Sequence, residues 1–117
     1  MNTEIFYREH KVGAVLDVKS DMCYCWGKWS THDSPVTCGF EEFLRKNTLK
    51  EWYARRAGKP IQFGEGKKRF WGIAIMIDGD GCFYYRVVRS KKTEAYLLNG
   101  KKLDKQSAAA NPPMANR

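Results

Sequence analysis

The feature that most constrains the fold is the run Asp-Gly-Asp-Gly at residues 78–81, which separates two apolar segments, 70–77 and 82–88. Aspartate–glycine pairs favour the tight turns that join neighbouring antiparallel strands, so we predict a β-hairpin here. Because the side chains of a strand alternate between its two faces, both faces of this hairpin are largely apolar. Such a hairpin is expected at the centre of a sheet, covered on both sides, or with its second face against a partner.

Another hairpin is predicted over residues 12–29, with its turn at Ser20 and Asp21. In this register one face carries only apolar or small side chains, whereas Tyr24 and Trp26 lie on the opposite, mixed face. That second face is suited to partial exposure. Residues 5–7 are expected to add a short strand before the hairpin, and residues 96–101 a strand at the sheet edge.

Between the hairpins, the sequence predicts two short helices at residues 39–46 and 49–57. An apolar stripe at helical spacing breaks at Asn47, because the apolar residues after it would fall on the opposite side of a continuous helix. Thr48 and Glu51 have the spacing of a capping box, which marks the start of a new helix, and Gly58 is expected to end it.

This order of elements predicts an α+β fold: an antiparallel sheet of four to five strands, built from two hairpins, with two short helices packed on one face. We expect a single α+β domain at residues 1–105, since 117 residues suffice for one core. Residues 106–117 are poor in large apolar side chains and are expected to form a low-complexity C-terminal tail.

Charge is divided unevenly along the chain, whose formal net charge is +8. Six Lys/Arg oppose seven Asp/Glu up to residue 48, whereas fifteen oppose six after it. A basic half that also carries aromatic residues is typical of proteins that meet an anionic partner, nucleic acid first. Candidates for phosphate contact are the basic clusters Arg55, Arg56, Lys67, Lys68, Arg69, Arg89, Lys91 and Lys92, with Tyr24 and Trp26 as candidates for stacking a base.

The first functional hypothesis is a small non-enzymatic accessory protein that binds nucleic acid through this basic half. The alternative is a self-associating protein-interaction or small-ligand-binding domain, a homodimer whose candidate interface residues are Tyr24, Trp26, Phe83 and Tyr85. Basic and aromatic groups that converge on one surface would favour nucleic acid, and a basic patch remote from the aromatic face would favour the alternative. A solvated basic surface around an aromatic core also explains the composition.

The four cysteines are expected to be reduced, because the chain shows no signal peptide, and the expected location is the cytoplasm, with no membrane contact. Cys23 and Cys25 lack the spacing of zinc ligands, so we expect no metal and no cofactor. A third hypothesis is a cysteine-dependent enzyme, with Cys38 near a helix start and His32 and Asp33 in the preceding loop. No oxyanion site accompanies them, and we expect no catalytic residues.

As a whole, the sequence is expected to form a compact single domain that begins at its own Met1 and ends in an Ala/Asn/Pro-rich tail. This organisation resembles the small orphan proteins encoded by mobile gene cassettes, such as those of integrons. The resemblance does not indicate a named protein family. It implies a bacterial, cytoplasmic, single-domain accessory protein.

Overall fold

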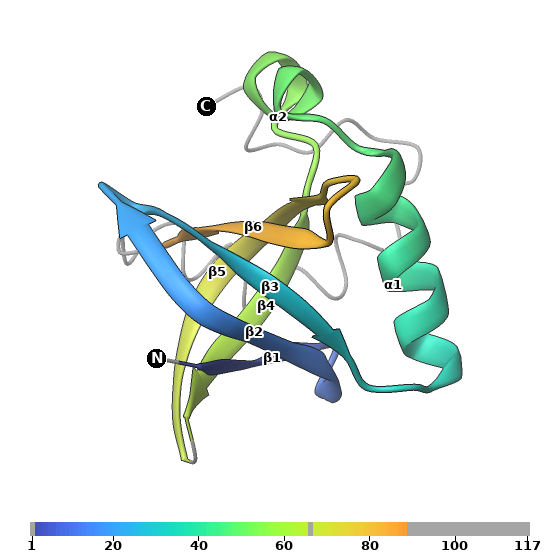
Figure 1. The fold of residues 1–117 in the computed structure, drawn as a ribbon, viewed down its shortest axis with the longest axis vertical. Coiled ribbons are helices and arrows are strands. Elements are labelled where there is room, and N and C mark those ends of the chain that lie inside the picture. Colours follow the sequence, from blue (N-terminus) through green and yellow to red (C-terminus); the bar gives the residue numbers. More distant parts are fainter. Residues whose placement is uncertain (1, 66, 89–117) are drawn as a thin grey trace.

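The computed structural model describes residues 2–65 and 67–88, and its strands close into an antiparallel β-barrel in the order β1-β2-β3-β6-β5-β4 (Figure 1). Helices α1 (Pro35–Lys46) and α2 (Leu49–Arg55) connect β3 to β4. The strands are β1 (Thr3–Tyr7), β2 (His10–Asp21), β3 (Tyr24–Thr31), β4 (Lys59–Glu65), β5 (Lys68–Ile77) and β6 (Cys82–Val87).

The predicted open sheet of four to five strands, with two short helices packed on one face, is wrong. Two three-stranded units, β1-β2-β3 and β4-β5-β6, meet along both of their edges, because β1 pairs with β4 and β3 pairs with β6. Closure of the barrel pairs the backbone N–H and C=O groups that the edge strands of an open sheet would leave without hydrogen-bond partners. The element missing from the prediction is β4, since Pro60 and Gly64 make its segment look like a loop.

Both predicted hairpins are present, but irregular pairing changes their registers. The first turn lies at Met22 and Cys23, beyond the predicted position, and β2 is irregular between Leu16 and Lys19. In β5 an irregularity between Ala74 and Met76 turns Ile77 into the interior, away from the face of its alternating neighbours. A bulge adds one residue to a strand, so strict alternation fails beyond it.

Both helices have the caps that their sequences favour. Ser34 caps α1 by accepting a hydrogen bond from the backbone N–H of Thr37 at 3.2 Å, and Pro35 begins the helix earlier than predicted. For α2, Thr48 Oγ1 accepts from the N–H of Glu51 at 3.1 Å, which confirms the capping residue. The helix ends at Arg56 in the left-handed conformation, before the predicted Gly58.

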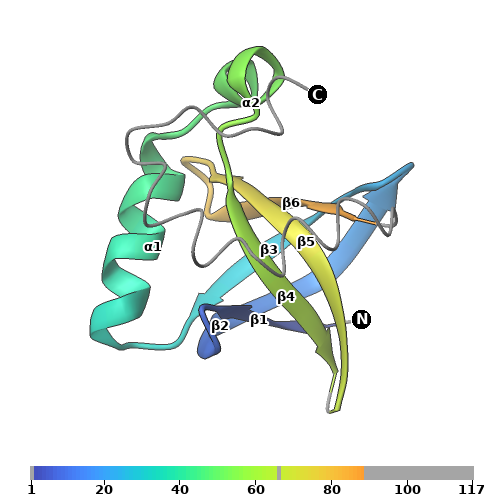
Figure 2. The ribbon, with the colours of Figure 1, turned by 180° about the vertical axis from the view of Figure 1, so that it is seen from behind.

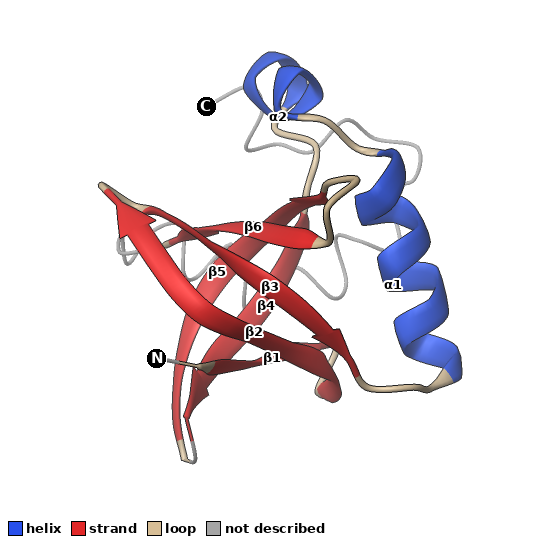
Figure 3. Cartoon of the chain, in the orientation of Figure 1, coloured by secondary structure: helices blue, strands red, loops and turns tan. Residues whose placement is uncertain are grey.

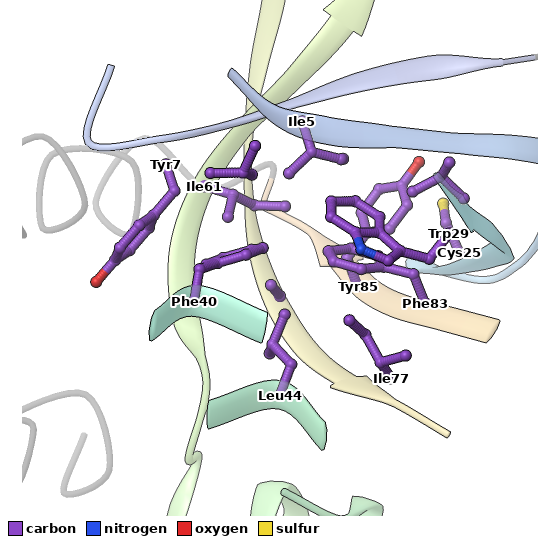
Figure 4. Close-up of a cluster of buried hydrophobic side chains, with 13 residues drawn as sticks. Ile5, Tyr7, Cys25, Trp29, Phe40, Leu44, Ile61, Ile77, Phe83 and Tyr85 are labelled. Carbon is purple, nitrogen blue, oxygen red and sulfur yellow. The ribbon is translucent and has the colours of Figure 1, made fainter. Parts of the chain in front are cut away.

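The core fills the barrel interior and extends to α1 (Figure 4). Phe40 and Leu44 of α1 pack among buried side chains from every wall, which means that the helix covers an open end of the barrel. Figures 2 and 3 show α1 beside the barrel and α2 above β6. A smaller cluster forms where Trp52 of α2 packs against Ile73 and Ile75 on the outside of β5.

Several expectations lie outside the described residues: the strand at 96–101, the tail at 106–117, and the basic residues Arg89, Lys91 and Lys92. In the part of the chain that the structure describes, neither helix has the length and apolar character needed to cross a membrane.

Candidate nucleic-acid interface

Aromatic and basic side chains meet on the outside of β3 and β6. Cys25, Phe83 and Tyr85 belong to the interior cluster, so the residues that alternate with them point outward. Cross-strand pairing places Trp26 beside Tyr84, and Tyr24 beside Arg86. We call this surface the outer wall, and it consists of Lys19, Asp21, Tyr24, Trp26, Lys28, Tyr84 and Arg86.

The outer wall carries a cation on each of its three strands, β2, β3 and β6. Lys19 pairs with Trp26 across β2 and β3, Lys28 pairs with Cys82, and the Arg86 guanidinium lies 5.6 Å from the ring centroid of Tyr24. The aromatic members are half-buried, whereas both lysines are exposed. Partly exposed aromatic rings beside exposed cations are a combination that proteins use to bind single-stranded nucleic acid.

Helix α2 extends this surface beyond Tyr24. The indole N–H of Trp52 donates a hydrogen bond to the Tyr24 hydroxyl at 3.2 Å, and the exposed ring of Tyr53 stands edge-on to Tyr24 at 6.5 Å. At the end of α2, the Arg56 guanidinium lies 5.3 Å from the Trp52 ring centroid. Arg55 is also exposed and pairs with Glu51 at 3.5 Å.

The ring of Tyr84 is held in place by the turn after β5. Its hydroxyl donates to Asp78 Oδ2 at 3.1 Å, while Asp78 Oδ1 accepts from the backbone N–H groups of Asp80 and Cys82. Burial and the bond to Asp78 raise the pKa of Tyr84 to about 12. Tyr84 therefore stays neutral at physiological pH and adds no negative charge to the outer wall.

The second basic cluster that the sequence predicted lies elsewhere. Lys67, Lys68 and Arg69 belong to the β4–β5 turn and the start of β5, at the end of the molecule opposite α2 (Figures 1 and 2). Arg69 packs over the ring of Phe6, 3.7 Å from its centroid, on the outer side of β1. The structure thus brings Arg56 to the aromatic residues and leaves residues 67–69 apart from them.

Two of the proposed interface residues are not on the surface. Phe83 is fully buried and Tyr85 is 2% exposed, both inside the barrel, because β6 turns these alternate positions inward. Trp29 stacks on Phe83 at 4.6 Å between ring centroids. An isologous contact through Phe83 and Tyr85 is therefore excluded.

The cysteines do not form a reactive arrangement. All four, which lie within the described residues, are free, and Cys38 is exposed on α1. Within the described residues, no hydrogen bond joins Cys38 to His32 or Asp33, and no three His, Cys, Asp or Glu side chains cluster as metal ligands. These positions thus offer no support for the cysteine-enzyme hypothesis.

Lys19, Tyr84 and Arg86 of the outer wall were missed as candidates by sequence reasoning. Alternation along 82–87 does place Tyr84 and Arg86 on one face. Their position beside Tyr24 and Trp26 depends on the pairing of β3 with β6, strands that are far apart in the sequence.

Comparison with known proteins found no matching family model, curated protein or solved structure.

Proposed function

We propose that the protein binds single-stranded nucleic acid on the outer wall. The observation that carries this proposal is the placement of Tyr24, Trp26 and Tyr84 side by side on two paired strands, between exposed cations. Base–aromatic stacking contributes about 1–3 kcal/mol per base, and each neutralised phosphate releases counterions. No enzymatic step is needed for this activity.

Single strands fit this surface better than a duplex. The rings lie on a convex barrel, where unpaired bases can reach them, whereas the bases of a duplex are stacked on each other. Arg56 and Arg86 lie along the same path toward α2 and can follow the phosphates. Since base stacking is tolerant of sequence, we expect weak sequence preference.

The test is fluorescence anisotropy with a labelled single-stranded oligonucleotide over a range of salt concentrations. Wild-type affinity should fall with salt, with a log–log slope of about −0.7 per phosphate contacted. Trp26→Ala should weaken binding by about 1–3 kcal/mol with little change in slope, because it removes a stacked ring and no charge. Arg86→Gln should reduce the slope by about one phosphate contact.

A matched control uses the cluster at the other end of the molecule. Joint replacement of Lys67, Lys68 and Arg69 by alanine removes three positive charges remote from the outer wall and should leave the effect of Trp26→Ala intact. If wild-type protein does not bind at low salt, or if the triple variant alone abolishes binding, the outer wall is not the nucleic-acid site.

Self-association through the same surface is the second candidate function. Tyr24 and Trp26 are half-buried, and Tyr24 lies beside Tyr53, which is 59% exposed. Half-exposed aromatic residues are enriched in protein interfaces. With the interior positions Phe83 and Tyr85 excluded, this candidate rests on the outward-facing rings alone.

A further inference from the structure

The aromatic rings on and beside the outer wall are spaced more widely than the bases of a stacked strand. Tyr24 and Trp26 lie two residues apart on β3 and point to the same side, so their backbone positions are about 6.6 Å apart. Toward α2, the ring centroids of Tyr53 and Tyr24 are 6.5 Å apart. Stacked bases follow one another at about 3.4 Å. Each step from one ring to the next is therefore about twice the distance between two stacked bases.

The rings also differ in orientation. The planes of Tyr53 and Tyr24 are inclined at 63° to each other. The bases of a continuous stack are parallel, so such a stack can lie flat on one of these rings but not on both. Bases that contact both rings have to separate from each other, whether each base lies on a ring or a ring inserts between two bases.

Two hydrogen bonds fix the positions of rings in this surface. The Tyr24 hydroxyl accepts from the indole N–H of Trp52 at 3.2 Å, and Trp52 is itself 1% exposed. Tyr84, which pairs with Trp26 across the strands, donates from its hydroxyl to Asp78 at 3.1 Å. Movement of either tyrosine toward its neighbours would break its bond. The wide spacing is therefore present before a strand binds, and the strand has to adapt to it.

Nucleic-acid strands differ in the cost of separating their bases. Adenines stack strongly on each other, whereas thymine and uracil stack weakly, and binding through aromatic rings favours pyrimidine runs for this reason. The exposed cations of β2 and β3, Lys19 and Lys28, can contact phosphates, which are the same in every sequence. Discrimination between sequences on this surface therefore comes from the conformation of the strand.

From the wide spacing, the inclined planes and the fixed positions of the rings, we infer that the outer wall binds an extended single strand with unstacked bases and prefers thymine or uracil runs to adenine runs. This inference rests on the proposed function and names the substrate class of the same site. The preference is modest, about threefold to tenfold in affinity, because it arises from the cost of unstacking and not from contacts to base edges.

The test compares labelled thymidine and deoxyadenosine decamers by fluorescence anisotropy at low salt. Wild-type protein should bind the thymidine decamer about threefold to tenfold more tightly. Warming should narrow this difference, because heat unstacks the free adenine run. The circular dichroism signal of stacked adenines should fall when protein saturates the deoxyadenosine decamer. Uridine and adenosine decamers repeat the comparison in RNA, and the tighter of the thymidine and uridine strands tells DNA from RNA.

Three variants separate the effect of the rings from that of the charges. Trp26→Ala removes a ring and should bring the ratio of the two affinities toward one, since fewer bases have to separate. Lys28→Gln removes the next cation along β3 and should weaken both strands about threefold, with the ratio unchanged. Asp21→Asn removes the carboxylate that pairs with Tyr24 and should tighten both strands, again with the ratio unchanged.

The inference is overturned if the deoxyadenosine decamer binds as tightly as the thymidine decamer, or if it keeps its stacking signal when bound. A ratio that Lys28→Gln changes as much as Trp26→Ala does would also overturn it. These results would leave single-strand binding by the outer wall intact. If no decamer binds at low salt, the proposed function is wrong, and the inference is wrong with it.

Discussion

Asn47 connects the end of α1 to the loop after α2 and to β5. It caps the end of α1 through its backbone N–H, which donates to the Phe43 carbonyl at 3.0 Å. Its side-chain Nδ2 donates to the carbonyls of Ala57 and Ile75, each at 2.7 Å. The residue is 8% exposed, so water does not readily replace these bonds. Asn47 thereby fixes the position of the linker between the helices relative to β5.

We expect Asn47→Ala to lower the free energy of unfolding by about 2–3 kcal/mol, because a buried carbonyl and a partly buried carbonyl lose their donor. Urea unfolding measures this change. Asn2→Ala is the control, since Asn2 makes an exposed bond to the N–H of Asp17 and its loss should change stability by less than about 0.5 kcal/mol. Equal effects of the two substitutions would contradict the role given to Asn47.

Asp78 provides a pH-dependent contribution to stability. The hydrogen bond from the backbone of Cys82, followed by those from Tyr84 and Asp80, lowers the pKa of Asp78 against the opposing effect of burial. A carboxyl with a lower pKa in the folded state than in the unfolded state stabilises the fold above its unfolded pKa. That contribution is lost as pH falls through the folded pKa.

We therefore expect the stability difference between wild type and Asp78→Asn to be largest near neutral pH and to shrink below about pH 4. Thermal unfolding of both proteins across this range measures it. A difference that stays constant down to about pH 2 would show that the Asp78 carboxylate contributes through packing alone.

At the scale of the elements, close strand contact depends on small residues. β2 and β3 approach each other closely at Gly27, where a Cβ would lie 2.5 Å from the Leu16 carbonyl oxygen and 2.7 Å from Val15 Cγ1. This is the place where pairing between the strands is irregular, between Leu16 and Lys19. The bulge bends β2 around the barrel, and Gly27 leaves room for it.

Gly27→Ala should destabilise the protein by about 3 kcal/mol, because the clash is with backbone that must move. Gly79→Ala is the matched substitution: its Cβ would meet nothing within 4 Å, and the change should be close to neutral. Chemical denaturation of both variants gives the comparison, and similar midpoints would contradict the close approach at Gly27.

For the whole molecule, barrel closure changes the argument for a homodimer. An open sheet would leave a second apolar face uncovered, whereas the barrel turns one face of every strand inward. The outer wall remains as the surface through which two copies can meet. The homodimer stays a prediction, and it now concerns Tyr24 and Trp26 without Phe83 and Tyr85.

We expect light scattering to give a dimer mass that falls toward the monomer in Trp26→Ala. Addition of a single-stranded oligonucleotide should also lower the number of protein copies per complex, because both partners use one surface. A monomer mass at every working concentration would contradict the self-association hypothesis. It would not affect the proposal that the protein binds nucleic acid.

The sequence alone was sufficient for features that depend on neighbouring residues. The Asp-Gly-Asp-Gly turn, the break between the helices and the Thr48 cap are local, and each is present in the structure. The uneven charge is likewise a property of composition. Local chemistry determines such features because the interacting groups are only a few residues apart.

Only the tertiary structure decided that the sheet closes. β1 with β4, and β3 with β6, pair across long stretches of chain, and the bulges that bend the strands follow no local signal. Closure placed Phe83 and Tyr85 inside and brought Tyr84 beside Trp26 and Arg86 beside Tyr24. The physical reason is that the unpaired backbone N–H and C=O groups of an edge strand can form hydrogen bonds with any suitable edge strand. Which edge strand lies within reach depends on how the whole chain folds.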